Sequence, residues 1–170
     1  RCWKMCGRYT LTVDLSALQA RYPYLDNELA LTPRYNIAPT DEVFSIAYRE
    51  TGDLKAGFLR WGLIPYWAKD ATIGNRMINA RAETLSEKPG FRRPSERRRC
   101  LIPSDGFYEW KKEDGLKIPM RIGLKNWEPF AFAGLWESWT NKETNEEVRS
   151  CTVITCHPND LVAPIHNRMP

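Results

Sequence analysis

Two histidines and one glutamate among aromatic residues are the side chains of this sequence best suited to moving protons. His166 stands two residues before Arg168 in a proline-flanked stretch, which favours a functional imidazole, whereas His157 lies in a Cys-His-Pro-Asn turn that favours a structural one. Glu109 follows two aromatic residues and precedes Trp110. A carboxyl group in such surroundings can have a raised pKa suited to proton transfer. A structural glutamate bonded to a partner is the alternative.

Cysteine supplies the nucleophilic side chains. The five cysteines are Cys2, Cys6, Cys100, Cys151 and Cys156. Their odd number and irregular spacing argue against a secreted disulfide framework and favour a reducing cytosol. Cys151, Cys156 and His157 lack the second half-site of a zinc centre, so we expect no metal. We expect Cys100 and Cys151 to be small apolar core residues.

Arginines and tryptophans could hold a polyanion. The segment from Arg92 to Arg99 has a local surplus of four positive charges, equal to the net charge of +4 of the whole chain. Such a run either contacts phosphates or forms a solvated loop, and the loop is the simpler interpretation. Trp61 and Trp67 flank a proline-containing loop and are candidates for stacking on unpaired bases. The tryptophans expected in the core are Trp110, Trp136 and Trp139.

The elements that must position these residues are mostly short strands. With 170 residues, 42% of them apolar and 27% charged, and a mean hydropathy of −0.53, the chain is typical of one soluble globular domain. Its apolar runs are too short to span a membrane. Strand-like runs cover residues 9–13, 43–48, 55–64, 100–103, 119–124, 130–136 and 150–155.

Turn and cap signals complete the predicted fold. Residues 113–115 and 141–147 are typical of hairpin connections. Asp14 is the expected N-cap of a helix over residues 15–22, residues 80–87 favour a weak helix, and Asn159 is expected to cap a turn. The predicted fold class is therefore α+β, mainly antiparallel β and barrel-like, with a few peripheral helices.

Seven short motifs follow one another along the chain: Met5-Cys6-Gly7-Arg8-Tyr9, Arg34-Tyr35-Asn36-Ile37-Ala38-Pro39, Trp61-Gly62-Leu63-Ile64-Pro65, Asn79-Ala80-Arg81-Ala82-Glu83-Thr84, Gly106-Phe107-Tyr108-Glu109-Trp110, Phe132-Ala133-Gly134-Leu135-Trp136 and His166-Asn167-Arg168-Met169-Pro170. In this order they resemble the SRAP (SOS response-associated peptidase) family. The resemblance implies a mainly β fold that binds single-stranded DNA and covalently traps abasic sites in the DNA damage response.

The resemblance places Cys6 as the attacking residue once the residues before it are removed. A cysteine at the N-terminus has an amine and a thiol on adjacent carbons, so the amine can condense with the aldehyde of an abasic sugar and the thiol can close a thiazolidine ring. An internal cysteine cannot, because its nitrogen is an amide. By the same resemblance, Asn79 would orient the amine or the sugar, Glu109 would move protons, and His166 would assist ring opening.

Further residues would hold the DNA. The resemblance implies that Arg8, Arg81 and Arg168 contact phosphates, that Asn36, Pro39, Trp61 and Trp67 shape or wedge the strand, and that Thr155 lies near the trapped sugar. The implied partner is single-stranded DNA with abasic sites, without a cofactor, a metal or a membrane. We expect a monomer, cytoplasmic and nucleoid-associated in a bacterium or nuclear in a eukaryote.

The predicted organisation is an extension over residues 1–5, absent from the mature active form, and a single SRAP domain over residues 6–170 whose C-terminal part is truncated. The extension is either a wrongly chosen start of the sequence or a segment that autoprocessing removes. Two other functions stay open. One is a self-cleaving cysteine peptidase in which Cys6 attacks the preceding peptide bond. The other is a non-covalent module for single-stranded DNA in which Cys6 is a small buried residue.

Overall fold

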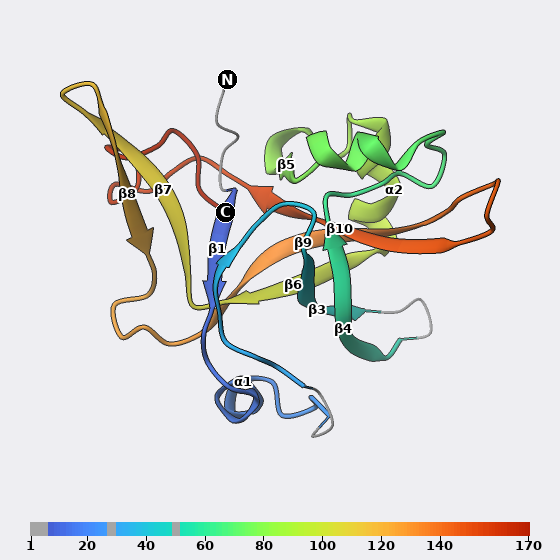
Figure 1. Ribbon diagram of the computed structural model, residues 1–170, viewed down its shortest axis with the longest axis horizontal. Coiled ribbons are helices and arrows are strands. Elements are labelled where there is room, and N and C mark those ends of the chain that lie inside the picture. The colour runs from blue at the N-terminus through green and yellow to red at the C-terminus, as the bar shows by residue number, and fades with distance from the viewer. Residues whose placement is uncertain (1–6, 27–29, 49–51) are drawn as a thin grey trace. The chain divides into compact units, whose positions relative to one another are not determined.

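Strands dominate the structure, as the sequence predicts. The computed structural model describes residues 7–26, 30–48 and 52–170. In these residues, strands and a few short helices form an α+β fold with a barrel-like sheet, which confirms the predicted fold class (Figure 1). None of the helices in these stretches is long and apolar enough to cross a membrane.

The described residues fall into two compact units, each assembled from separate stretches of the chain. Unit 1 takes its residues from 1–38, 103–131 and 157–169, and unit 2 takes its residues from 39–102, 132–156 and 170. Because both units are interleaved along the sequence, neither corresponds to a continuous segment of the chain.

Unit 1 is built on an antiparallel sheet that has four strands among the described residues. In spatial order these are β2 (Arg34–Ile37), β1 (Arg8–Leu11), β7 (Gly106–Glu113) and β8 (Leu116–Ile122) (Figure 1). β1 pairs with β7 so that Arg8 lies opposite Tyr108. The turn from β7 to β8 has positive φ at both Asp114 (49°) and Gly115 (77°), which is typical of a type I′ hairpin and confirms the predicted connection.

Helix α1 (Leu15–Arg21) of unit 1 begins where its cap signal predicts. The Asp14 carboxylate accepts hydrogen bonds from the Ala17 backbone N–H (2.9 Å) and the Ser16 hydroxyl (2.7 Å). These bonds, with the one from Ala17 the larger cause, lower the pKa of Asp14 below its usual value. Leu18 is fully buried and anchors the helix to the core.

Asp105 fastens β1 to the corner where β7 begins. Its carboxylate accepts hydrogen bonds from the Thr10 hydroxyl and from the Thr12 backbone N–H (2.6 Å) and hydroxyl (2.5 Å). Arg121 on β8 donates a further bond of 3.1 Å, and its guanidinium lies 4.5 Å from the ring centroid of Trp127. Asp105 is only 2% exposed, so this network satisfies a carboxylate that would be costly to bury alone.

Unit 2 is built on a six-stranded sheet among the described residues. In spatial order its strands are β4 (Leu54–Trp61), β3 (Glu42–Tyr48), β6 (Arg99–Ser104), β9 (Phe130–Thr140), β10 (Glu147–Thr155) and β5 (Asn79–Arg81). β4 also pairs in parallel with β10, with Ser150 opposite Arg60 and Cys151 opposite Trp61. This pairing closes five of the strands into a barrel-like ring, and β5 extends from β10.

The interior of this ring follows from the alternation of side chains along its strands. Cys151 shares a face with Trp61 on β4 and with Trp136 on β9, because it lies opposite both. A Cβ at Gly134, two residues before Trp136, would come within 2.9 Å of the Cys100 Sγ atom, so Cys100 also faces the interior. Cys100 and Cys151 are both buried, which confirms that they are core residues.

The predicted helix over residues 80–87 is wrong. This region contains β5, the 3-10 helix η2 (Ala82–Thr84) and turns. Val153, Ile154 and Thr155 of β10 lie opposite the three residues of β5. The sheet pairing therefore outweighs a helix propensity that was weak in the sequence.

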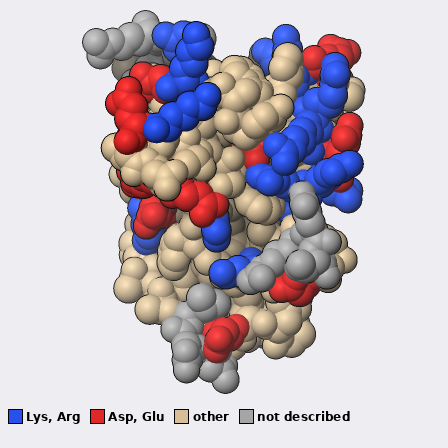
Figure 2. Space-filling model, turned by 90° about the vertical axis from the view of Figure 1, so that its right-hand side faces the viewer, with Lys and Arg blue, Asp and Glu red and all other residues tan. Residues whose placement is uncertain are grey.

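The arginine-rich run is mostly a helix, α2 (Pro89–Arg97), which corrects the interpretation of this run as a loop. Pro89 occupies the first turn, where its fixed φ suits a helix start. Gly90 is buried, and a Cβ there would come within 2.6 Å of the Met77 Cε atom, so the helix packs closely through its glycine. Arg92, Arg93 and Arg97 are exposed, and Figure 2 shows basic side chains gathered on a face of unit 2.

Candidate functional site

Arg8 and Asn36, both predicted to contact DNA, lie together in unit 1. Arg8 begins β1, and Asn36 lies on the neighbouring strand β2. The Arg8 Nη1 atom donates a hydrogen bond of 2.7 Å to the Asn36 Oδ1 atom. The amide therefore holds a cationic side chain on the sheet surface, where a phosphate could reach it.

This pair lies in a surface hollow with a cavity volume of about 370 Å³, which we call the Arg8 groove. Its lining residues are Arg8, Tyr35, Asn36, Tyr108, Trp110 and Pro119. Tyr35 is 68% exposed, and the Tyr108 hydroxyl donates a hydrogen bond of 3.3 Å to the Tyr35 carbonyl. Aromatic faces beside an arginine are the usual means of holding unpaired bases and their phosphates.

The aromatic lining of the Arg8 groove was missed by sequence reasoning. Trp110 was expected in the core, but it is only half-buried and lines the groove, so that prediction is wrong. Tyr108 and Trp110 are two residues apart on β7 and therefore share a face of the strand. This alternation is present in the sequence, but β7 was not among the predicted strands.

Glu109 lies on the other face of β7, away from Tyr108 and Trp110. It shares that face with Phe107, and Tyr9 of β1 lies opposite Phe107. Tyr9, Phe107 and Glu109 are 1%, 6% and 3% exposed. Glu109 is thus a carboxyl group shielded from bulk water beside aromatic side chains, as its sequence surroundings indicated.

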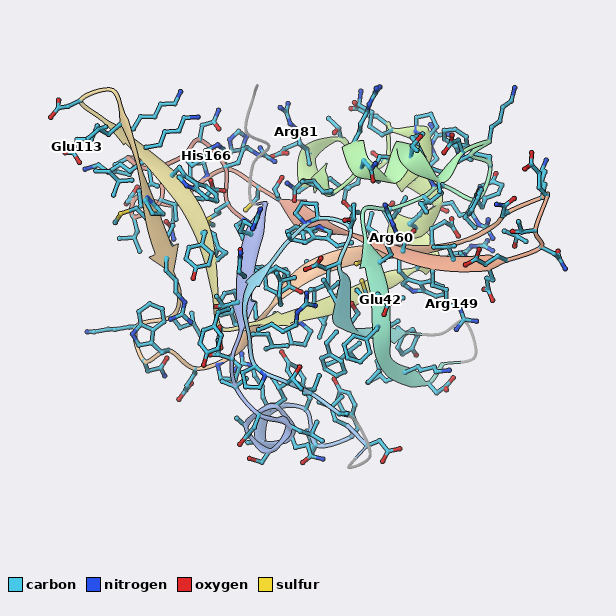
Figure 3. The ribbon with its side chains drawn as sticks, in the orientation of Figure 1. Glu42, Arg60, Arg81, Glu113, Arg149 and His166 are labelled. Atoms are coloured by element: carbon cyan, nitrogen blue, oxygen red, sulfur yellow. The ribbon has the colours of Figure 1, made fainter. Side chains whose placement is uncertain are left out.

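His166 lies at the end of a turn that Asn159 caps in unit 1 (Figure 3). The Asn159 Oδ1 atom accepts a hydrogen bond of 3.0 Å from the Val162 backbone N–H, which confirms the predicted cap. The Val162 carbonyl in turn accepts one of 2.9 Å from the His166 backbone N–H. The Arg168 backbone N–H donates a bond of 3.1 Å to the His166 Nδ1 atom, which also lies 3.3 Å from the Arg168 carbonyl oxygen, so the Arg168 backbone fixes the orientation of the imidazole ring.

Arg168 was predicted to contact phosphate, but its side chain is 7% exposed and belongs to the buried part of unit 1. Its backbone fixes the His166 ring, as described above. Arg168 therefore does not present an accessible guanidinium to solvent, as Arg8 does.

Unit 2 brings Asn79, Arg81 and Thr155 together. Asn79 and Arg81 are the first and last residues of β5, and Thr155 lies opposite Arg81 in the parallel pairing with β10. The Thr155 hydroxyl donates a hydrogen bond of 3.5 Å to the carbonyl of Ala80, which is itself fully buried. Arg81 is exposed at this end of β10 (Figure 3).

Trp61 was predicted to stack on DNA, but it is 1% exposed and lies in the core of unit 2. Its indole Nε1–H donates a hydrogen bond of 2.9 Å to the Ile78 carbonyl, directly before β5. A second bond of 3.1 Å runs from the Val153 backbone N–H to the same carbonyl. Trp61 therefore helps to position the strand that carries Asn79 and is not itself a stacking surface.

Trp67 has the exposure that a stacking residue needs. It is 49% exposed and borders a surface hollow of about 640 Å³ that Lys69, Asn75 and Arg76 also line. Asp70, at the edge of this hollow, caps the 3-10 helix η1 (Ala71–Arg76) through a bond of 2.7 Å from the Thr72 backbone N–H. Pro39 is half-buried and stands three residues before strand β3 begins at Glu42.

The predicted nucleophile Cys6 lies outside the described residues. Of the described cysteines, Cys100 and Cys151 are poor nucleophiles, because burial raises the pKa of Cys100 well above its usual value and that of Cys151 to about 12. Cys156 is half-buried. No group of three His, Cys, Asp or Glu side chains that could hold a metal ion occurs in the part of the chain that the structure describes.

These features define an α+β protein built on a barrel-like sheet, with an arginine and aromatic groove on a second sheet. The chain belongs to the SOS response associated peptidase (SRAP) family, whose sequence model matches residues 5–170. This confirms the resemblance carried by the seven motifs.

Named relatives cover nearly the whole chain. Abasic site processing protein YoqW of Bacillus subtilis is 50% identical over 169 residues, which are 98% of this chain and 75% of the relative. Abasic site processing protein YoaM of the same organism is 47% identical over 173 residues, covering 98% of this chain and 74% of the relative. A crystal structure of a protein from Bacteroides thetaiotaomicron is 30% identical, with a TM-score of 0.86, and covers 97% of this chain and 75% of that one.

Proposed function

We propose that this protein binds single-stranded DNA and traps abasic sites covalently through a thiazolidine formed by Cys6 after the residues before it are removed. The observation that carries the proposal is the 50% identity, over 98% of the chain, to a relative named abasic site processing protein. The Arg8 groove supports it, because its aromatic faces suit bases that have no pairing partner. The trapped lesion would then be shielded during the DNA damage response.

The covalent step balances without a cofactor. The free amine of Cys6 attacks the aldehyde carbon of the open abasic sugar, and loss of one water gives an imine. The Cys6 sulfur then bonds to the same carbon, and the imine nitrogen takes the proton that the thiol releases. The five-membered ring closes readily because the thiol is tethered beside the imine.

The buried carboxyl group of Glu109 suits the proton transfers of imine formation, because bulk water does not compete with it at 3% exposure. His166 suits the opening of the closed sugar. The Arg168 backbone holds the Nδ1 edge of the His166 ring, so Nε2 is the ring nitrogen that remains for proton exchange with the ring oxygen of the sugar. Asn79, held on β5 by the pairing with β10, would orient the amine or the sugar.

A second candidate function is self-cleavage, which the family description as a peptidase favours. In this reaction the Cys6 sulfur bonds to the carbonyl carbon of Met5, and the Cys6 nitrogen leaves as an amine with the proton that the thiol releases. Water then hydrolyses the resulting thioester, so that the peptide ending at Met5 departs as a carboxylic acid and the thiol is regenerated. The two activities are compatible because self-cleavage would produce the amine that trapping needs.

A purely non-covalent function is the third possibility and predicts no adduct. For all three functions we expect a monomer that is located with the cellular DNA.

The test is incubation of the purified chain with a single-stranded oligonucleotide carrying one abasic site, followed by denaturing gel and intact-mass analysis. We expect an adduct that survives denaturation and has the mass of a chain beginning at Cys6. Cys6→Ala should lose the adduct and keep most of the reversible binding. A stable adduct that retains residues 1–5 would refute the thiazolidine, because the Cys6 nitrogen is then an amide.

A further inference from the structure

The barrel of unit 2 has a cavity at one open end that the proposed function does not use. Its volume is about 440 Å³, within the range of small-molecule sites, and the mouths of β-barrels are common places for them. We call this cavity the barrel mouth. The lining residues that carry the argument are Lys55, Gly57, Phe58, Arg98, Trp136 and Arg149.

One wall of the barrel mouth is a stacked pair of planar groups. The Arg98 guanidinium carbon lies 4.9 Å from the ring centroid of Trp136. Arg98 also forms an ion pair with Glu137, which is 1% exposed. The buried carboxylate thus holds the guanidinium beside the indole ring, and planar guanidinium and indole groups are surfaces on which nucleic-acid bases stack.

Two paired strands of the barrel mouth carry further positive charge. Lys55 comes from β4 and Arg149 from β10. Arg149 donates two hydrogen bonds of 3.2 Å to Glu147, and Glu147 also accepts one of 2.5 Å from the Ser138 hydroxyl. Glu147 and Glu137 balance two of the three cationic side chains, so the described residues of the mouth keep a surplus of one positive charge. A ligand with a negative group is therefore favoured over a neutral one.

The space between these groups is open at Gly57. No atom lies within 4 Å of the position that a Cβ would take at this residue. Gly57 lies opposite Ser45, so both face the cavity from neighbouring strands. The absence of a side chain here leaves room for a planar ligand to approach the Arg98 and Trp136 pair.

The barrel mouth is separate from the cluster of Asn79, Arg81 and Thr155 in the same unit. Arg149 and Thr155 are six residues apart on β10, which is roughly 20 Å along a strand. Figure 3 shows Arg81 and Arg149 in different parts of unit 2. A ligand in the mouth would not occupy the cluster.

We propose that the barrel mouth binds a nucleotide, with its base against the Arg98 and Trp136 pair and its phosphate near Lys55 and Arg149. The inference goes beyond trapping and rests on the chemistry of the cavity alone. The nucleotide is either a free mononucleotide or an unpaired residue of a DNA strand, since both present the same base and phosphate.

Titration of the full chain with dAMP tests the proposal, with deoxyadenosine and inorganic phosphate as partial ligands. The readouts are calorimetry and the NMR signal of the Trp136 indole N–H, assigned with Trp136→Phe. We expect dAMP to bind more tightly than either partial ligand. Gly57→Leu should weaken dAMP binding by about tenfold or more, because the new side chain fills the cavity. Lys55→Ala should weaken dAMP and spare deoxyadenosine, and Lys142→Ala, an exposed lysine outside the cavity, should change neither.

Two outcomes would overturn the proposal: dAMP that binds no better than phosphate, or Gly57→Leu that folds and binds dAMP like the parent. Should Gly57→Leu fail to fold, Lys55→Ala decides, because Lys55 is exposed. Displacement of dAMP by an oligonucleotide without a lesion identifies a strand residue as the natural ligand, and no displacement identifies a free nucleotide. Trapping of abasic DNA by Gly57→Leu should stay unchanged, so failure of this site and failure of trapping are distinguishable.

Discussion

The guanidinium of Arg8 on β1 is held by the side-chain oxygen of Asn36 on β2, across 2.7 Å. The two residues are neighbours only because their strands pair in the sheet of unit 1. An arginine with one N–H group committed to an amide keeps others for a phosphate, and it loses less side-chain freedom when the phosphate arrives. Asn36 is thus a positioning residue for Arg8.

This relationship predicts different effects for the two alanine variants. Arg8→Ala should weaken binding to all single-stranded sequences alike and reduce the salt slope by about 0.7, the value for one phosphate contact. Asn36→Ala should weaken binding less and leave the slope near that of the parent. Fluorescence anisotropy over a range of salt concentrations measures both, with Lys125→Ala as the exposed control. Additive losses in the double variant would contradict the coupling.

Glu109 offers a test of proton transfer by a substitution that keeps the side chain nearly the same size. Glu109→Gln keeps the size of a side chain that is 3% exposed but removes its ionisable group. The rate of adduct formation with abasic DNA should fall about 100- to 10,000-fold, the usual contribution of a general acid or base. Reversible DNA affinity should change little. An unchanged rate would reduce Glu109 to a structural residue.

The network around Asp105 predicts how stability depends on pH. Burial raises the pKa of Asp105, but the hydrogen bonds from Thr10 and Thr12 and the charge of Arg121 outweigh it, so the pKa lies below its usual value. A lowered folded-state pKa means stabilisation that is fully present above the unfolded-state pKa, near 3.9, and is lost as the pH falls toward the folded-state value.

Asp105→Asn should therefore be less stable than the parent at neutral pH, and the difference should shrink as the pH falls below about 4. Urea unfolding at a series of pH values measures this difference. Asp114→Asn, in the exposed hairpin turn, is the matched control. A difference that stays constant down to acid pH would show that the charge of Asp105 is not the source of its effect.

Thiol reactivity should follow burial. With the pKa of Cys151 raised to about 12 and that of Cys100 well above its usual value, neither thiol forms appreciable thiolate near neutral pH. Iodoacetamide should label the half-buried Cys156 in the native protein and reach Cys100 and Cys151 only after unfolding. Peptide mass mapping before and after denaturant distinguishes the sites. Rapid native labelling of Cys151 would contradict the closed interior of the barrel.

Much of the strand content could be predicted from the sequence, because β-branched residues and alternating apolar residues are typical of strands. The cap at Asp14 and the hairpin turn at Asp114 were predicted for the same reason, since their signals are local. β2 and β5 were missed because they are short and gain their hydrogen bonds from strands far away in the sequence. β7 was missed because Glu109 interrupts its apolar face.

The sequence indicates which types of residue the candidate site contains, but it does not indicate which of their side chains are exposed. Arg8 and Asn36, both predicted to hold DNA, contact each other, and their action on DNA stays a prediction. Burial was the harder property to predict, because Trp61, expected at the surface, is 1% exposed, whereas Trp110, expected in the core, is half-buried. Trp61 is covered where β4 meets β10, and Trp110 lies near the outer strand β8. A barrel closes through pairing of strands that are far apart in the sequence, such as β4 and β10, and a local sequence pattern does not reveal such pairing.

The pairing of Arg8 with Tyr108 also limits when the sheet of unit 1 can form during synthesis. β1 must wait for about 100 further residues before its partner β7 leaves the ribosome, which takes roughly 5 to 20 s at ordinary rates of synthesis. During that interval one edge of β1 has unpaired backbone groups, and such edges invite wrong pairing. Contacts this distant in sequence also slow folding. The sheet that carries the Arg8 groove is therefore a late product of folding, and its first strand is among the segments that most need protection from aggregation before it forms.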